Sequence, residues 1–177
     1  MVVFVALSLA YPLAVYAMLG HLEPRWLAPL PCLLALLRAL ATRERLWLWV
    51  AAGTGALAVW AFLSNAALPL KLYPVLVNAA LLLLFGLSLR FGPPVIERLA
   101  RLREPELPPA AMAYTRRVTV VWCGFFMLNG CVALATALWA SERVWALYNG
   151  LVSYVLIGTL FAVEWWVRQR VKARAHG

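Results

Sequence analysis

The sequence predicts an all-α integral membrane protein, a bundle of about six transmembrane helices with a short interfacial helix on its cytoplasmic side. Composition is the first reason: 65% of the residues are hydrophobic and 13% are charged, whereas soluble domains have about 45–50% apolar and about 25% charged residues. The second reason is a series of apolar runs, each near the roughly 20 residues that a helix needs to cross a bilayer. The third is the clustering of basic residues between alternate runs.

Six apolar runs divide the chain, which we interpret as a single membrane domain over residues 1–177. In order, the runs are 2–19, 26–41, 46–63, 72–89, 118–139 and 144–166, and they leave a polar cytoplasmic loop at 90–117 and a basic tail at 167–177. No Lys or Arg precedes the first run, so it lacks the basic region of a signal peptide. We therefore expect this run to be retained as a helix.

The Lys and Arg residues are distributed unevenly among the connections. Thirteen of the sixteen lie at 38–45, 90–117 and 168–174, and the other three are Arg25, Lys71 and Arg143. Cytoplasmic loops of membrane proteins carry the excess of basic residues. The sequence therefore predicts a multi-pass protein with both termini in the cytoplasm.

Aromatic and small residues have expected positions in such a bundle. Tryptophan and tyrosine prefer the membrane–water interface, and we expect this of the aromatic residues near the ends of the runs, including Tyr73 and Trp145. Glycine lets neighbouring helices approach closely. We expect this of the glycines inside the runs, which include Gly124, Gly130 and Gly150.

The polar loop at 90–117 contains a candidate short helix. Two prolines, which favour the first turn of a helix, precede apolar residues at helical spacing: Val95, Ile96, Leu99 and Leu102. Glu97 stands one turn before Arg101, a spacing that suits an ion pair. We expect this helix to lie in the cytoplasmic interface with its apolar side toward the membrane. The alternative is an irregular, solvated loop.

Basic residues of the same loop form a predicted cytoplasmic platform. Its members are Arg98, Arg101, Arg103, Arg116 and Arg117. Basic residues beside apolar runs are typical of contacts with anionic lipid head groups. Membrane lipids, including anionic ones, are therefore the expected partners, and nucleic acid is not.

Polar residues within the apolar runs form a predicted intramembrane polar cluster, because such residues usually face the interior of a bundle. They are Asn78, Asn129, Asn149, Ser153 and Glu164. Helical spacing places Trp122, Phe126 and Asn129 on one face of the fifth run, and Trp145, Asn149, Ser153, Leu156, Leu160 and Glu164 on one face of the sixth. We expect these two faces to pack together.

Two interpretations of this cluster remain open. The asparagines either form hydrogen bonds between helices or line a binding site. Glu164 either pairs with Arg168, one turn further on, or serves as a proton or cation site.

The sequence contains no recognisable catalytic motif. It has no Asp, its two histidines are His21 and His176, and no HExxH motif or nucleophile elbow occurs. The cysteines Cys32, Cys123 and Cys131 lie inside apolar runs without the spacing of zinc ligands. We therefore predict no cofactor, no metal and no catalytic residue.

Several segments between 72 and 170 resemble a family of uncharacterised bacterial inner-membrane proteins that is distantly similar to the intracellular septation protein A family. The segments are Tyr73-Pro74-x-x-Val77-Asn78, Pro94-x-Ile96-Glu97-Arg98-Leu99, Tyr114-Thr115-Arg116-Arg117, Trp122-Cys123-Gly124-Phe125-Phe126-x-x-Asn129-Gly130 and Trp145-x-x-Tyr148-Asn149-Gly150. The resemblance implies a small polytopic protein of the inner membrane. It also implies partners among the membrane proteins of envelope synthesis.

Three functions are compatible with these observations. The leading hypothesis is a non-enzymatic inner-membrane scaffold or accessory protein in cell-envelope or lipid biosynthesis. One alternative is a transporter of lipids or small molecules that uses the intramembrane polar cluster. Another is an intramembrane enzyme that acts on acyl chains.

Overall fold

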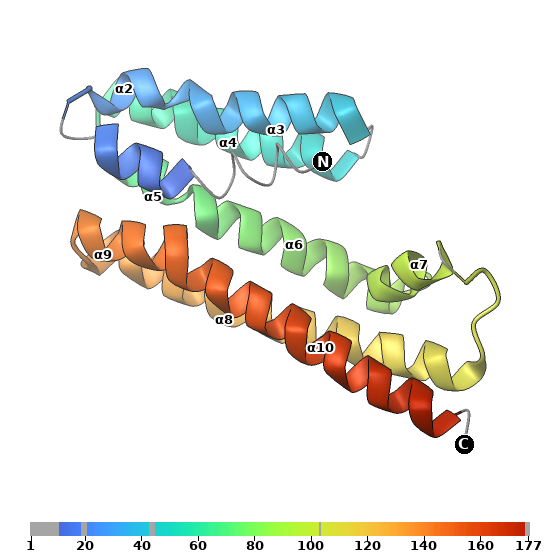
Figure 1. Ribbon diagram of the computed structural model, residues 1–177. Coiled ribbons are helices and arrows are strands. Elements are labelled where there is room, and N and C mark those ends of the chain that lie inside the picture. Colours follow the sequence, from blue (N-terminus) through green and yellow to red (C-terminus); the bar gives the residue numbers. More distant parts are fainter. Residues whose placement is uncertain (1–10, 19–20, 43–44, 103, 176–177) are drawn as a thin grey trace.

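Every described element of this computed structural model is a helix (Figure 1). The structure describes residues 11–18, 21–42, 45–102 and 104–175. Residues 11–18 are helical, and the helices that follow are α2 (Pro24–Leu27), α3 (Pro29–Thr42), α4 (Arg45–Ser64), α5 (Leu68–Lys71), α6 (Tyr73–Arg90), α7 (Val95–Arg101), α8 (Pro109–Trp139), α9 (Glu142–Leu147), the π-helix η1 (Tyr148–Val152) and α10 (Ser153–Ala175). The all-α prediction is confirmed for this part of the chain.

Three helical segments are long and apolar enough to cross a membrane: Leu68–Arg90, Pro109–Trp139 and Glu142–Arg170. They correspond to the runs at 72–89, 118–139 and 144–166, and they identify the chain as a membrane protein by length and composition.

The prediction of six spans is not supported. Within the described residues, the apolar segments Pro24–Leu37 and Leu48–Ser64 are shorter than a span. Helix α3 has 14 residues, or about 21 Å at 1.5 Å per residue, which is less than a hydrocarbon core of about 30 Å. Most of the run at 2–19 lies outside the described residues.

The polar loop is shorter than predicted, because α8 begins at Pro109 rather than at Val118. Proline is tolerated in the first turn of a helix, and the Ala, Met and Arg residues that follow it favour helix. Helix α7 confirms the short helix expected within the loop, and Nη2 of Arg101 lies 2.8 Å from Oε1 of Glu97, as its spacing predicted.

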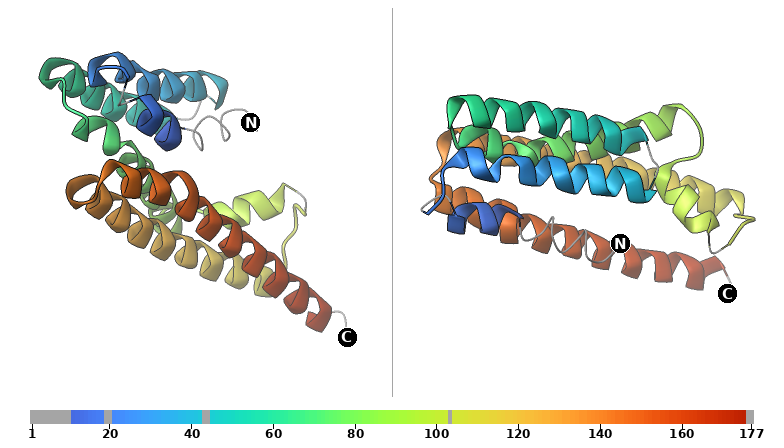
Figure 2. Two further views of the ribbon diagram at one scale, coloured as in Figure 1. Left: turned by 60° about the vertical axis from the view of Figure 1, so that its left-hand side comes forward. Right: turned by 90° about the horizontal axis from the view of Figure 1, so that it is seen from above.

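The segments that carry most of the basic residues meet at one end of the bundle (Figure 1). Helix α3 ends there, α4 begins there, α6 ends beside α7 there, and α10 runs toward it; the connection between α8 and α9 lies at the other end. This arrangement agrees with the uneven distribution of Lys and Arg. Helices α3 and α4 lie on one side of α6, and α8 and α10 lie on the other (Figure 2). The most extensive packing joins α6 to α8 and α3 to α4.

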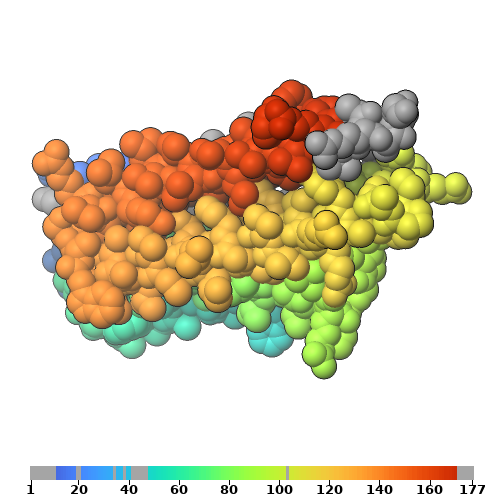
Figure 3. Space-filling view, turned by 90° about the horizontal axis from the view of Figure 1, so that it is seen from below, coloured from blue at the N-terminus to red at the C-terminus, as the bar shows by residue number. Residues whose placement is uncertain are grey.

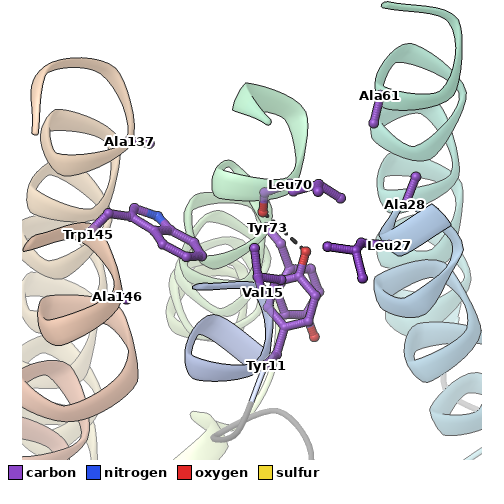
Figure 4. Close-up of a cluster of buried hydrophobic side chains, with 10 residues drawn as sticks. All are labelled: Tyr11, Val15, Leu27, Ala28, Ala61, Leu70, Tyr73, Ala137, Trp145 and Ala146. Carbon is purple, nitrogen blue, oxygen red and sulfur yellow. Dashed lines mark hydrogen bonds between the residues drawn. The ribbon is translucent and has the colours of Figure 1, made fainter. Parts of the chain in front are cut away.

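A buried core of aliphatic and aromatic residues, including Tyr11, Tyr73 and Trp145, lies at the end opposite most of the basic residues (Figure 4). The rings of Tyr11 and Tyr73 lie 4.6 Å apart, and the hydroxyl of Tyr11 donates to the carbonyl oxygen of Leu70 at 3.2 Å. Trp145 is fully buried, and its Nε1–H donates to the carbonyl oxygen of Lys71 at 3.1 Å. The expectation that Tyr73 and Trp145 face the membrane interface is therefore wrong, because both side chains fill the contact between helices.

Candidate functional site

Asn78 on α6 and Asn129 on α8 bind each other directly. Nδ2 of Asn129 donates to Oδ1 of Asn78 at 3.0 Å, and Nδ2 of Asn78 donates to the carbonyl oxygen of Pro74 at 2.8 Å. The hydroxyl of Tyr148 donates to Oδ1 of Asn129 at 2.9 Å. These bonds join α6, α8 and η1, and both asparagines are buried.

Asn149 and Ser153 continue this polar network along η1 and α10. Nδ2 of Asn149 donates to the carbonyl oxygen of Trp145 at 2.9 Å and to Oγ1 of Thr136 on α8 at 3.1 Å. Oγ of Ser153 donates to the carbonyl oxygen of Asn149 at 3.1 Å. The structure thus brings four of the five predicted cluster residues together.

Two adjacent residues of the π-helix η1 both reach α8. In a regular helix, Tyr148 and Asn149 would point about 100° apart, since each turn holds 3.6 residues. A π-helix has a wider turn with i→i+5 hydrogen bonding, and such turns often occur at functional sites. Here Tyr148 bonds Asn129 and Asn149 bonds Thr136, both on α8, from within such a turn.

Two glycines allow the helices to approach closely around the network. A Cβ atom on Gly130 would lie 3.2 Å from Cβ of Asn78, and one on Gly150 would lie 2.8 Å from Cγ of Leu13. The expected role in helix packing is confirmed for these two residues. It is wrong for Gly124, where a Cβ atom would meet nothing within 4 Å.

The cavity beside the polar network is small. Its volume is about 80 Å³, which leaves room for a few water molecules but lies well below the roughly 300–1,000 Å³ of ligand pockets. The side-chain NH₂ groups of Asn78, Asn129 and Asn149 all donate within the bundle, and Oδ1 of Asn78 and of Asn129 accept from Asn129 and Tyr148. The network is therefore best explained as hydrogen bonding that stabilises the contacts among helices.

Beyond η1, most of the face predicted for α10 lies toward α8, since Leu160 and Glu164 line a hollow together with Val118 and Trp122 of α8. Leu156 is the exception, because it is 43% exposed. Ile157 lines the small cavity, as Ser153 does. Ile157 takes this place at the ordinary i, i+4 spacing from Ser153.

Glu164 lies apart from the other predicted cluster residues, at the basic end of the molecule. It is eleven residues beyond Ser153 on α10, a distance of about 16 Å along the helix. Its backbone carbonyl accepts a hydrogen bond of 3.3 Å from the hydroxyl of Tyr114 on α8. The inclusion of Glu164 in the intramembrane cluster is therefore wrong.

Glu164 lines a groove of about 510 Å³ between α7, α8 and α10, which we call the α7–α10 groove. Its lining is mostly apolar and includes Ile96, Leu99, Leu107, Ala111, Trp122 and Phe161. Arg168 and Glu104 also line it. The expected ion pair between Glu164 and Arg168 is absent, and neither side chain forms one with any other described residue. Figure 3 shows α8 and α10 side by side on one face of the molecule.

The predicted basic platform divides into residues with different roles. Arg101 binds Glu97 and also donates from Nη1 to the carbonyl oxygen of Pro105 at 3.1 Å, so it fastens the loop after α7. Arg98, Arg116 and Arg117 are exposed. Arg103 lies outside the described residues.

Helix α7 packs against α8 through a side that the sequence did not indicate. Glu97 and Ala100 are buried there, while Leu99 and Leu102 are 55% and 81% exposed. The exposed leucines suit the predicted contact of this helix with a membrane surface.

Sequence reasoning missed Tyr148 as a member of the network and missed the α7–α10 groove. Tyr148 is adjacent to a predicted polar residue, and its hydroxyl bonds Asn129 across the contact with α8. The groove combines residues from three separate helices, so no local pattern marks it. Among the described residues, no three His, Cys, Asp or Glu side chains lie close enough together to hold a metal ion.

No protein-family model matches the chain, and neither a curated protein nor a solved structure matches it.

Proposed function

We propose that this chain is a non-enzymatic scaffold or accessory protein of the bacterial inner membrane that acts in cell-envelope or lipid biosynthesis. One observation carries the proposal: polar groups inside the bundle bind one another, while unpaired arginines are presented at one end. Arg98 and Arg116 are exposed there and form no ion pair with a described residue. This distribution favours contacts made at the end of the bundle over chemistry performed inside it.

The resemblance to septation protein A relatives supports the same proposal, because it extends to the residues of α7 and the start of α8. In this proposal the chain crosses the inner membrane several times, up to six, and both termini lie in the cytoplasm. The meeting of the basic segments at one end of the bundle supports this orientation. Partners are membrane proteins of envelope synthesis that contact the exposed arginines.

Transport through the intramembrane polar cluster receives less support. The cavity there is about 80 Å³, Asn78 and Asn129 already bind each other, and Asn149 binds Thr136. A lipid head group would fit only if α6, α8 and α10 moved apart and those bonds broke. Acyl-chain chemistry at Ser153 receives little support, because its hydroxyl donates to the carbonyl of Asn149 and has no neighbouring His in the sequence.

Site-specific photo-crosslinking in native membranes tests the scaffold proposal. A photoreactive residue placed at Arg98 should yield crosslinks to membrane proteins of envelope or lipid synthesis. The matched position is Leu147, which is also exposed but lies at the opposite end of the bundle. It should not yield the same products.

A charge-reversal variant provides the second part of this test. Replacing Arg116 and Arg117 by Glu should reduce the Arg98 crosslinks, since partner surfaces that complement arginine are repelled by like charge. Identical products from Arg98 and Leu147, or crosslinks from Arg98 to lipid alone, would contradict the proposal.

A further inference from the structure

We propose that the α7–α10 groove binds a phospholipid of the surrounding bilayer whose head group carries a primary amine, of the phosphatidylethanolamine type. The groove lies beside the exposed arginines that we assign to partner contacts. Arg98 and Arg116 do not line it. The lipid site is therefore separate from the proposed partner surface.

The size and lining of the groove suit an acyl chain. At about 510 Å³ it falls within the range of roughly 300–1,000 Å³ that is typical of ligand pockets. Leucine, isoleucine and aromatic side chains dominate its surface, with Trp122 and Phe161 in ring contact along it. An acyl chain that lies against such side chains is removed from contact with water.

The charges in the groove suit a zwitterionic head group. Glu164 and Arg168 are one helical turn apart, carry opposite charges and line the same groove without forming an ion pair. Arginine binds phosphate through a planar fork of N–H donors, and an ammonium group offers three donors to a carboxylate. A lipid with phosphate and amine therefore satisfies both side chains, and Glu104 adds a second carboxylate to the lining.

Other ligands satisfy this arrangement less completely. A purely anionic lipid would complement Arg168 but leave the carboxylates facing negative charge. A phosphatidylcholine head group has the same net charge, but its quaternary amine has no hydrogen to donate. The primary amine is thus the feature that Glu164 distinguishes.

The neighbouring aromatic residues support the bilayer as the source of the ligand. Trp165 and Trp166 follow Glu164 directly and are 61% and 50% exposed, and tryptophan prefers the depth of the head groups. The guanidinium of Arg170 lies 3.4 Å from the ring centroid of Trp166. This turn of α10 therefore carries the side chains expected where head groups are found.

Lipid retention by the purified full chain tests the proposal. The protein is exchanged into nanodiscs containing equal amounts of phosphatidylethanolamine, phosphatidylcholine and phosphatidylglycerol with matched acyl chains. It is then extracted, and native mass spectrometry measures the lipids that stay bound. The wild-type protein should retain phosphatidylethanolamine in preference to both other lipids.

Variants assign the preference to the two charges. Glu164→Gln should reduce the preference for phosphatidylethanolamine over phosphatidylcholine by roughly tenfold, as expected for loss of one charge-assisted hydrogen bond. Arg168→Gln should reduce retention of all three lipids, since each carries a phosphate. Glu106→Gln and Arg116→Gln are matched controls at the same end, exposed and outside the groove, and should change nothing.

Three results would overturn the proposal. The first is equal retention of phosphatidylethanolamine and phosphatidylcholine by the wild type. The others are an unchanged lipid preference in Glu164→Gln, or a loss of preference in Glu106→Gln as large as that in Glu164→Gln. Circular dichroism reports whether each variant is folded. Should Glu164→Gln fail to fold, Glu164→Asp, which keeps the charge, takes its place and should keep the lipid preference. The wild-type retention of phosphatidylethanolamine against phosphatidylcholine also tests the proposal by itself. Because no partner protein is present, the outcome is independent of the crosslinking at Arg98.

Discussion

Replacing Asn129 by Ala should destabilise the bundle through the loss of two bonds between helices. Its amide donates to Asn78 on α6 and accepts from Tyr148 on η1, at 3.0 Å and 2.9 Å. Hydrogen bonds between membrane helices contribute about 0.6 kcal/mol on average and up to about 1.7 kcal/mol. Two such bonds give a loss of about 1.2 kcal/mol, with an upper limit of about 3.4 kcal/mol for two of the strongest.

A double-mutant cycle separates this hydrogen bonding from a general effect of truncation. The free energy of unfolding is measured for Asn78→Ala, Asn129→Ala and the double variant by titrating folded protein in bicelles with a denaturing detergent. We expect a coupling energy of about 0.6 kcal/mol for this pair. A second cycle with Asn129→Ala and Tyr148→Phe should show a similar coupling.

Thr159 supplies the control for these cycles. Its hydroxyl bonds only to the carbonyl oxygen of Val155 on the exposed side of α10, so Thr159→Ala should show no coupling to Asn129→Ala. Strict additivity for both Asn78 and Tyr148 would refute the network as a stabilising contact. It would also restore a binding site as the better interpretation of these asparagines.

Three further outcomes are expected. Trp145→Phe keeps an aromatic ring but loses the Nε1–H bond to a backbone carbonyl and leaves a cavity at a fully buried position, so the same titration should show a loss of more than about 1.5 kcal/mol. Gly130→Ala places a Cβ atom 3.2 Å from Cβ of Asn78, which must shift by a few tenths of an ångström, and should cost about 1 kcal/mol, whereas Gly124→Ala in open space should be nearly neutral. In a variant without native cysteines, Glu106→Cys and Ser141→Cys should react with an impermeant maleimide from opposite sides of the membrane, and labelling from one side would contradict the proposed orientation.

Much of the fold follows from the apolar runs and from polar residues at helical spacing. The last three runs became the three membrane-length segments, and the burial of Asn78, Asn129 and Asn149 followed from the cost of polar groups in lipid. The short helix at Val95–Arg101 followed from its prolines and apolar spacing. These features depend on local sequence, which is why they could be read from it.

The remaining features depend on contacts between distant segments. Helical spacing from Ser153 allows either Leu156 or Ile157 to face α8, and the packing of the bundle decides for Ile157, which lines the small cavity while Leu156 is exposed. Trp145 lies near the end of an apolar run, where tryptophan is expected at the membrane interface. Its burial depends on helices from distant parts of the sequence that pack around it. The start of α8 was placed too late, because charged residues at its beginning resembled a loop.

The length of α8 sets the distance between the basic end and the membrane. Its 31 residues span about 46 Å, so at an average tilt of about 20° the helix exceeds a core of about 30 Å by roughly two turns. Helix α7 packs against α8, and Arg116 lies in the first turns of the same rigid rod. The height above the lipid surface of the proposed partner would therefore depend on the length of α8 relative to the thickness of the bilayer. In a thicker bilayer, the same rod would draw that partner closer to the head groups.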